Sequence, residues 1–503
     1  MIIYLKWIIK SYQLIKEKNM AKKNIYLKKL LENAKQEVEH FLNVFSQQVL
    51  SGDASLFVGS GISRDSGFPS WSGLLEPCAD ELGITLGDNP DLYSIAQYYV
   101  NRNKDAELRR HFSSAINRYT PESAVLNLLL EIPYNSIWTT NYDKLIERRL
   151  ENNYVGCNVI ADDKDLSNIS KGSKINIYKM NGDVSNTASM VITRNDYEHY
   201  SQKHPLLLTF LKRELVSSTF LFVGYSFSDA LVLDCLSSLN EFLGEFGNCH
   251  YAIMLVDEKV TAQTLYFFED LHIRYNVKCI ALLKDEIPKL ICRLINKIKE
   301  KKIFISGAYD SITDVNTIFA DKLSNELVCK LYDNQYRIAT GVGKHLGTFI
   351  TGYAHQYLAQ HRIANPDFFL SMRPFPFHLE LEEDEKIRYR KIMQADCSAA
   401  VFMFGQSKTT ESEGGYEKTG HYSKGVYMEY ELAKEAGLMI IPVGSTGYEA
   451  EIIWNEVKKN INKYYYLSKK IDKLHDETDP VKLSEIILSI LRDIPQKNSI
   501  QQK

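Results

Sequence analysis

The sequence predicts an α/β protein made of two doubly wound, Rossmann-like parallel-sheet domains, preceded by N-terminal helices. The chain has 503 residues, which is too long for a single ordinary hydrophobic core. Short apolar runs alternate with helical patterns along most of the chain, as in a parallel α/β sheet. An apolar run that ends in a glycine turn occurs at 54–61 and again at 303–307, which indicates two domain starts. We therefore expect four segments, with the boundaries 1–50, 51–298, 299–495 and 496–503.

The first segment is predicted to be a helical extension. Residues 24–50 carry apolar side chains at helical spacing and predict one long helix. Residues 1–18 are apolar but contain Lys6 and Lys10, so this stretch is too short and too charged to span a membrane. Two interpretations of it are open: an amphipathic helix that packs on another subunit, or an extension upstream of a natural start at Met20.

Apolar runs that end in polar or glycine-containing loops predict the strands of the first domain. These runs lie at 54–58, 136–140, 175–179, 220–223 and 252–256, with helical patterns between them, as at 126–130 and 206–215. Ligands of parallel sheets bind at the carboxyl ends of the strands. We therefore expect the loops after these strands to form a ligand site.

A second α/β unit begins after the charged run at 299–302. Its predicted strands lie at 303–307, 336–340, 367–372, 398–404 and 438–443, with helices at 313–332 and 346–360. Residues 406–423 are polar and are predicted to form a long loop, which is either a lid or simply mobile. The polar tail 496–503 is predicted to be disordered.

Composition argues against several functional classes. The 60 basic and 63 acidic residues give a net charge of -3, which is unlike a protein that binds a nucleic-acid backbone. The eight cysteines form no C-x-x-C pair, which argues against a structural zinc site and against a secreted disulfide framework. We therefore expect a cytoplasmic protein with no metal, no nucleic acid and no membrane segment.

The loops after the first domain's strands carry residues suited to nucleotide chemistry. Gly59-Ser60-Gly61 and then Ser63 follow the first strand. Such a turn lets the backbone approach a pyrophosphate, and the helix after it offers N–H groups to negative charge, although many glycine turns bind no ligand. Further candidates after later strands are Asn141, Asp143, Asn181, Gly224, Ser226 and Asp229.

Four of these segments together resemble the sirtuin family. They are residues 59–69, 139–143, 178–183 and 224–229, and the resemblance covers about residues 40–290. It implies NAD+ as the substrate, bound by the glycine loop and by the loop at 224–229. It also implies that Asn141 and Asp143 hold the nicotinamide carboxamide and its ribose, so that nicotinamide leaves and water attacks the sugar cation. Without the resemblance, the favoured interpretation is that Asn141 is a helix cap and Asp143 a first-turn residue.

The sequence departs from the sirtuin pattern in two ways. Asn181 stands where that family has a histidine base, and an amide cannot accept a proton near neutral pH. Asn181 can still form a hydrogen bond with a ribose hydroxyl, so either this copy is impaired or it activates water in another way. The two cysteine pairs of the zinc-binding deacetylases are also missing, which favours hydrolysis of NAD+ itself.

Over residues 40–490 the chain also resembles the effector family of Thoeris antiphage defence. The additional segments that carry this resemblance are 75–77, 96–99, 373–376 and 442–448. That family joins a sirtuin-like NADase to a SLOG domain, so the resemblance assigns NAD+ hydrolysis to 51–298 and nucleotide sensing to 299–495. It further implies a homotetramer and a cyclic ADP-ribose activator, which a TIR-domain partner protein makes after infection.

The same resemblance implies an effector site in the second domain. Glycine turns permit close approach of the backbone, and guanidinium groups can grip phosphate oxygens. The implied effector-binding residues are Ser306, Gly307, Gly343, Arg373, Arg388, Lys424 and Glu429. From the residues alone, the arginines and Glu429 fit surface ion pairs as well. The interrupted glycine pair at 442–447 favours sensing over nucleotide cleavage in this domain.

The sequence therefore predicts an NAD+ glycohydrolase that a cyclic ADP-ribose signal switches on, so that NAD+ depletion stops an infection. Two alternatives stay open. One is an NAD-dependent protein deacylase, and the other is a catalytically dead nucleotide-binding regulator, because of Asn181.

Overall fold

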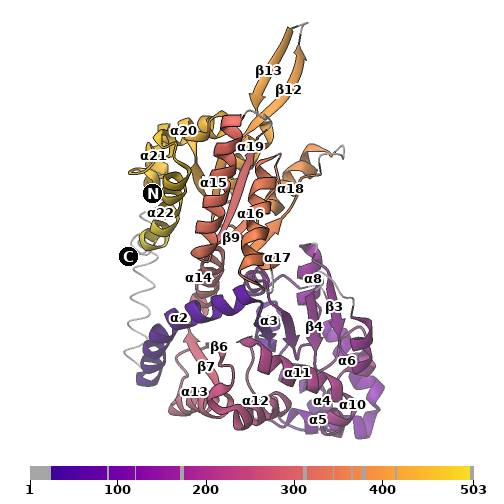
Figure 1. Cartoon of the computed structure of the whole chain (residues 1–503). Coiled ribbons are helices and arrows are strands. Elements are labelled where there is room, and N and C mark those ends of the chain that lie inside the picture. Colours follow the sequence, from indigo (N-terminus) through magenta and orange to yellow (C-terminus); the bar gives the residue numbers. More distant parts are fainter. Residues whose placement is uncertain are drawn as a thin grey trace, which may run out of the picture. The chain divides into compact units, whose positions relative to one another are not determined.

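The computed structural model describes residues 24–498, with short gaps. These gaps are 88–89, 119, 154, 170–174, 310–313, 344, 364–365, 377–380 and 414–415. The chain divides into two compact units, Met1–Ile295 and Asn296–Lys503, whose elements are labelled in Figure 1. The predictions for residues 1–18 and 499–503 lie outside the described residues.

The first unit contains a seven-stranded sheet in which every neighbouring pair is parallel. The strand order is β3-β4-β2-β1-β5-β6-β7. The bounds are β1 (Ala54–Val58), β2 (Ser136–Thr139), β3 (Cys157–Ile160), β4 (Ile175–Lys179), β5 (Thr219–Val223), β6 (His250–Leu255) and β7 (Val277–Leu282). The sequence analysis missed β3 and β7. Both are edge strands that bury only part of their side chains, so their apolar pattern is weaker.

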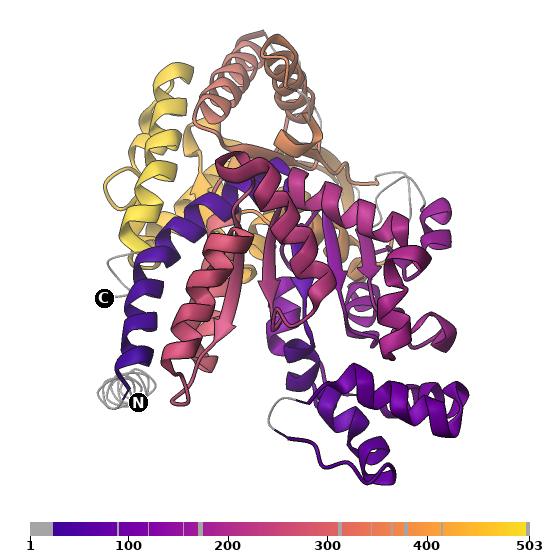
Figure 2. The same ribbon diagram turned by 90° about the horizontal axis from the view of Figure 1, so that it is seen from below.

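Helices cover this sheet. Their bounds are α2 (Ile25–Ser51), α3 (Ser60–Asp65), α4 (Trp71–Glu81), α5 (Leu92–Asn103), α6 (Asp105–Ile116), α7 (Ala124–Leu129), α8 (Leu145–Asn152), α9 (Arg194–Glu198), α10 (Tyr200–Lys203), α11 (Pro205–Ser217), α12 (Ala230–Leu243), α13 (Ala262–Tyr275) and α14 (Ile287–Lys299). The predicted long helix is α2, which Asn24 caps at its start and Gly52 ends in a left-handed conformation. Helices α4, α5 and α6 form a small cluster beside the sheet (Figure 2).

The topology of this sheet creates a crevice at β1. The chain places β2 on one side of β1 and later returns to place β5 on its other side. The chain therefore leaves β1 toward β2 and leaves the neighbouring β5 toward β6, in opposite directions, and parallel α/β sheets bind ligands at such a point. This is the edge at which the candidate NAD+ residues were predicted.

The second unit contains a five-stranded parallel sheet with the order β10-β9-β8-β11-β14. The strand bounds are β8 (Lys302–Ala308), β9 (Arg337–Thr340), β10 (Leu370–Met372), β11 (Ala399–Phe404) and β14 (Met439–Pro442). The helices are α15 (Asp314–Asp333), α16 (Leu346–Gln360), α17 (Pro366–Phe369), α18 (Glu383–Gln394), α19 (Lys424–Glu435), α20 (Tyr448–Lys459), α21 (Lys473–Asp476) and α22 (Pro480–Asn498). The α/β class and two parallel-sheet units are confirmed.

Three local predictions for this unit are wrong. Residues 406–423, predicted as a loop, form the antiparallel hairpin of β12 (Gln406–Glu413) and β13 (Tyr416–Tyr422), because its polar strands pair with each other by backbone bonds. The strand predicted at 367–372 is limited to β10, since α17 occupies the first three residues of the segment. The predicted disordered tail begins too early, because α22 continues to Asn498.

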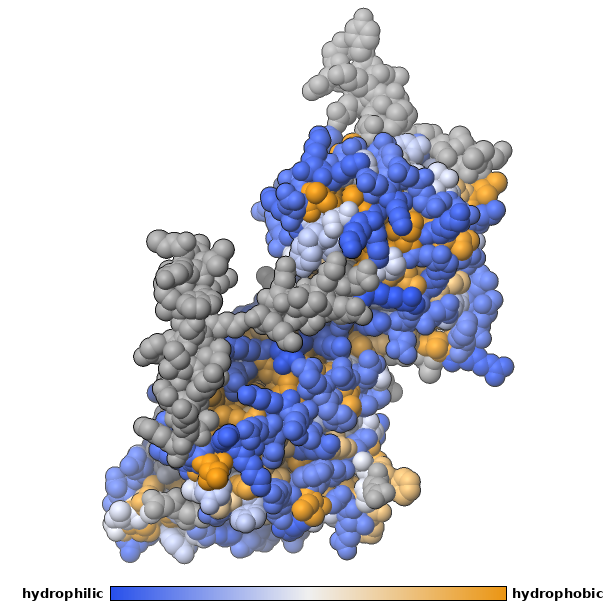
Figure 3. Space-filling model, turned by 90° about the vertical axis from the view of Figure 1, so that its left-hand side faces the viewer, coloured by the Kyte–Doolittle hydropathy of each residue, from blue (hydrophilic) through white to orange (hydrophobic). Residues whose placement is uncertain are grey.

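The described helices can be compared with the length and hydropathy that a membrane span requires. Within the described residues, no helix is both long and apolar enough to cross a bilayer. The face in Figure 3 is mostly hydrophilic, with hydrophobic side chains in separate patches.

Candidate functional site

Loops at the carboxyl edge of the first sheet enclose a pocket of about 140 Å³. The predicted residues that line it are Ser60, Ser63, Asn141, Asp143, Asn181, Ser226 and Asp229. Aromatic residues form much of the remaining wall, namely Phe68, Trp71, Tyr93, Tyr142 and Tyr225. The volume is below the roughly 300–1,000 Å³ of typical small-molecule pockets. A whole dinucleotide therefore requires the walls to move apart or extends beyond the pocket.

Asn141, Asp143 and Ser63 form one hydrogen-bonded group. The amide Nδ2 of Asn141 donates to the Ser63 hydroxyl at 2.9 Å and to the Gly59 carbonyl at 3.1 Å. The Ser63 hydroxyl donates to Oδ2 of Asp143 at 2.6 Å, and Oδ1 accepts the Leu145 amide at 3.0 Å. Asp143 thus bonds to the first residue of α8 and also lines the pocket, but Asn141 does not cap this helix and Asp143 does not lie in its first turn, because the N-cap is Lys144. These bonds fix both side chains before any ligand arrives.

The glycines of the first loop allow two loops to pack closely. The amides of Gly59 and Gly61 donate to the carbonyls of Val223 and Gly224, both at 2.9 Å. A Cβ on Gly59 would lie 2.6 Å from the carbonyl carbon of Gly224, which is too close for any side chain. These two amides are therefore already bonded, and the glycines bring the β1 and β5 loops together. Gly59, Gly61 and Gly224 shape the pocket without lining it.

Asn181 presents an unsatisfied acceptor at this pocket. Its side chain is 7% exposed, and Oδ1 has no hydrogen-bond partner among the described residues. Its backbone is fixed, because the Asn181 carbonyl accepts the Val191 amide at 2.9 Å. A buried acceptor without a partner destabilises the folded protein by about 1–3 kcal/mol. A ligand hydroxyl that donates a hydrogen bond to Oδ1 would remove this penalty. None of the described residues that line the pocket is a histidine.

Asp229 is held by a tyrosine that the sequence analysis did not identify. The Tyr197 hydroxyl donates to Oδ1 of Asp229 at 2.5 Å, and the Leu231 amide donates to the same oxygen at 3.0 Å. Burial raises the pKa of Asp229 above its ordinary value. The ring of Tyr93 packs against Tyr197, with centroids 4.5 Å apart. Tyr197 lies on α9, outside every motif, so nothing in the sequence indicated it.

A second, smaller pocket of about 100 Å³ lies at the carboxyl edge of the second sheet. Of the predicted effector residues, Ser306, Gly307, Gly343 and Glu429 line it. The Ser306 hydroxyl donates to Glu429 at 2.6 Å. Burial raises the pKa of Glu429.

The arginine that lines this second pocket is Arg390, which the sequence analysis did not select. Its side chain is buried over Phe375, with the guanidinium carbon 4.1 Å from the ring centroid, and its Nε lies 3.7 Å from Glu429. Its Nε and Nη1 are buried without a hydrogen-bond partner among the described residues. Burial lowers the pKa of Arg390. The predicted residues Arg373, Arg388 and Lys424 are not part of the lining.

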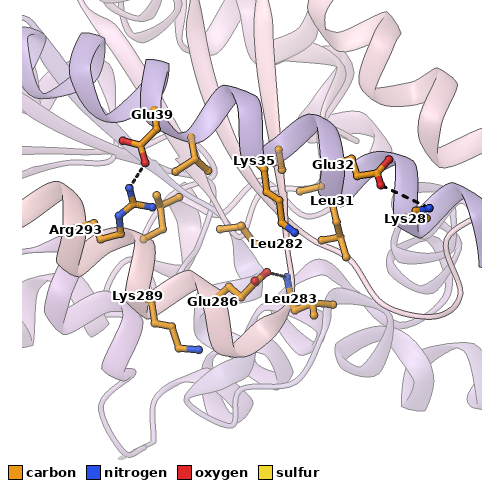
Figure 4. Close-up of a pocket in the computed structure, with 14 residues that line it drawn as sticks. Lys28, Leu31, Glu32, Lys35, Glu39, Leu282, Leu283, Glu286, Lys289 and Arg293 are labelled. Carbon is orange, nitrogen blue, oxygen red and sulfur yellow. Dashed lines mark hydrogen bonds and ion pairs between the residues drawn. The ribbon is translucent and has the colours of Figure 1, made fainter. Parts of the chain in front are cut away.

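A third cavity, of about 630 Å³, is larger than the two pockets above and contains no predicted site residue. It lies between α2 and α14 in the first unit (Figure 4). Its floor is apolar, with Leu31 and Leu282, and its rim is charged, with an ion pair between Glu39 and Arg293. Such a mixture carries no chemistry related to NAD+.

Comparison with known proteins establishes the family of the chain. A SIR2-like domain model matches residues 135–276, and the model of the Sir2- and TIR-associating SLOG family matches 286–494. An NAD(+) hydrolase ThsA of Bacillus cereus (strain MSX-D12) is 31% identical over 474 residues, covering 90% of this chain and 97% of the relative. The chain belongs to the ThsA family.

Other ThsA relatives have similar coverage. The NAD(+) hydrolase ThsA of Cytobacillus dafuensis is 31% identical and covers 85% of this chain and 90% of its own length. The NAD(+) hydrolase ThsA of Enterococcus faecium is 29% identical, and the match covers 90% of this chain and 98% of the relative. The SIR2-like match includes Asn141 and Asn181, whereas Gly59 precedes it, and the SLOG match includes the second pocket.

Proposed function

We propose that this chain hydrolyses NAD+ to nicotinamide and ADP-ribose in the first pocket, under control of a nucleotide in the second. The observation that carries the proposal is the convergence of Asn141, Asp143 and Asn181 on one pocket at the crevice beside β1. The ThsA relatives that match 90% of this chain are named NAD(+) hydrolases.

The lining residues suit cleavage of the bond between nicotinamide and ribose. Asn141 and Asp143 hold the carboxamide and the ribose, so that the bond to the nicotinamide nitrogen breaks and a sugar cation forms. Carboxylates and oriented dipoles stabilise such a cation. The pocket offers two carboxyl groups, those of Asp143 and Asp229. A water oxygen then bonds to the sugar carbon, and its proton passes to solvent.

Asn181 limits the rate in this proposal. Its Oδ1 accepts a hydrogen bond from a ribose hydroxyl but cannot remove a proton from it. We therefore expect that Asn181→His raises the rate of NAD+ hydrolysis by about 10²–10⁴-fold, the usual contribution of a general base.

The test measures nicotinamide release by the full chain and by Asn181→His, each with and without cyclic ADP-ribose isomers. Asn101→His serves as the control, because Asn101 is exposed on α5 and does not line the pocket. An increase with Asn181→His, but not with Asn101→His, supports the proposal. Absence of hydrolysis in all three proteins under all conditions refutes it.

A second candidate function, a nucleotide-binding regulator without turnover, is favoured by the same residue. The unsatisfied Oδ1 of Asn181 favours binding even though the amide cannot act as a base. Tight binding of ADP-ribose without turnover by the chain or by Asn181→His would favour this function.

For the second pocket we propose a cyclic ADP-ribose-type activator, made by a TIR-domain partner protein. Nε and Nη1 of the buried Arg390 have no hydrogen-bond partner among the described residues, although Nε lies 3.7 Å from Glu429, and such donors suit an anionic phosphate. Ser306 and Glu429 suit ribose hydroxyls, and the glycines permit close approach. Arg390 replaces Arg388 as the proposed phosphate ligand because it lines the pocket.

The remaining predictions complete the proposal. Residues 51–298 form the sirtuin-like NAD-hydrolysing domain, and residues 299–495 form the SLOG nucleotide-sensing domain. The chain acts as a cytoplasmic homotetramer in antiphage defence, without metal. Light scattering of the purified chain measures the assembly, and a monomer would contradict it.

A further inference from the structure

Lys179 places a fully buried ammonium group beneath the candidate active site. It is the last residue of β4 and lies opposite Thr139 of β2 in the sheet. Its side chain is 1% exposed and does not line the pocket. Neither the sirtuin-like motifs nor the function proposed above gives it a role.

The ammonium of Lys179 contacts both loops that carry the candidate catalytic residues. It donates to the backbone carbonyls of Asp143 at 2.5 Å and Tyr142 at 3.3 Å, both in the loop after β2. It also pairs with Glu147 of α8 at 2.9 Å and with Asp183, in the loop after β4, at 2.5 Å. One ammonium therefore links the loop of Asn141 and Asp143 to the loop of Asn181.

The charges around Lys179 keep it protonated. Burial by itself lowers the pKa of Lys179, but Glu147 and Asp183 outweigh this effect and raise the pKa above its ordinary value. Burial also opposes ionisation of Asp183, yet the Lys179 ammonium lowers the pKa of that carboxyl. Buried ion pairs contribute little net stability compared with apolar residues of similar volume. The directional bonds to the two carbonyls are what an apolar residue cannot replace.

The geometry points to Lys179 as a positioning residue that sets the distance between Asn141 and Asp143 on one side of the pocket and Asn181 on the other. This inference rests on the proposed function. The bond from the Met180 amide to the Thr139 carbonyl, at 2.9 Å, joins the same two strand ends. Lys179 extends this connection into the loops, where one further backbone bond, from the Val184 amide to the Tyr142 carbonyl at 3.0 Å, also joins them.

The test separates positioning from stability with two variants in the full-length Asn181→His chain. Lys179→Met removes the ammonium but leaves two buried carboxylates without a cation. The triple variant Lys179→Met, Glu147→Gln and Asp183→Asn removes the charges of all three residues. Lys302→Met is the control, because Lys302 is a buried strand lysine of the second unit, outside both pockets.

We expect Lys179→Met to lower both the melting temperature and kcat for NAD+ hydrolysis. If the loss of the ammonium moves the candidate catalytic side chains by about 1 Å, kcat should fall by about 10²-fold. The triple variant should regain the melting temperature, since no buried charge is left without a partner, but not kcat. Recovery of kcat together with stability, or an unchanged kcat in Lys179→Met, would overturn the inference.

A binding measurement keeps the inference testable if the proposed function fails. If the full chain, Asn181→His and Asn101→His all release no nicotinamide under any condition, the proposed hydrolysis is refuted, and ADP-ribose affinity is measured by calorimetry instead. The triple variant should then bind ADP-ribose about tenfold more weakly than its parent, a loss of about 1.4 kcal/mol. Equal affinity would show that Lys179 does not position the pocket, whereas Lys302→Met should match the parent.

Discussion

Substitution of Gly59 by alanine should separate the loops that build the first pocket. A Cβ there would lie 2.6 Å from the Gly224 carbonyl carbon. Carbon atoms in contact lie about 3.5 Å or more apart, so the loops must separate by about 0.9 Å. The obstacle is backbone, which cannot rotate away as a flexible side chain could.

The expected cost affects both stability and activity. Overpacking of this kind destabilises a protein by about 1–3 kcal/mol. In a unit of this size, each kcal/mol lowers the melting temperature by about 2–4 °C. Because the shift occurs beside Ser60 and Ser63, we also expect NAD+ hydrolysis in the Asn181→His chain to fall by about 10²-fold.

Differential scanning fluorimetry and a nicotinamide-release assay measure these two effects. Gly87→Ala is the matched control, since a Cβ at Gly87 has nothing within 4 Å. If Gly59→Ala matches Gly87→Ala in both assays, the close contact between the two loops is not part of the folded protein, and our account of the pocket is wrong.

Three further predictions concern single groups. Ser63→Ala removes the hydroxyl that joins Asn141 to Asp143, so the free energy of unfolding in urea should fall by about 1–3 kcal/mol. An unchanged free energy of unfolding would contradict the two hydrogen bonds of this hydroxyl. Arg390→Met should weaken binding of cyclic ADP-ribose by about 1.5–3 kcal/mol in calorimetry, whereas equal losses for Arg388→Met would argue against a special role for Arg390. Because Asp183 has a lowered pKa, its contribution to stability is present above the unfolded pKa and is lost as pH falls through the folded pKa. In Asp183→Asn the free energy of unfolding should therefore fall less steeply as pH is lowered. An unchanged pH dependence would show that the ion pair of Asp183 with Lys179 does not cause the loss of stability in acid.

The sequence predicted the strands that dominate each sheet, because their apolar runs are short, bounded by polar turns and buried on both faces. The run at 54–58 matches β1 residue for residue, and the run at 175–179 matches β4. The edge strands β3 and β7 of the first sheet escaped prediction, since both leave part of their surface exposed. The hairpin of β12 and β13 escaped because backbone pairing between polar strands leaves no apolar pattern.

The site prediction depended on the same strand ends. Strand ends can be read from the sequence, so Asn141, Asp143 and Asn181 could be expected at one edge of the sheet, where the structure brings them to one pocket. Their catalytic roles stay predictions. Arg388 and Arg390 are two residues apart on α18, so they point to different faces of the helix, and the pattern did not reveal which face meets the pocket.

The amino-acid sequence by itself determined the α/β class, the two sheets and the polar strand ends, because these depend on local periodicity and on the loops between strands. Only the tertiary structure decided that Gly59 packs against Gly224, that Arg390 lines the second pocket and that Lys179 joins two loops. Each of these contacts joins residues from different elements, and their distances are fixed by how the elements pack rather than by any local pattern.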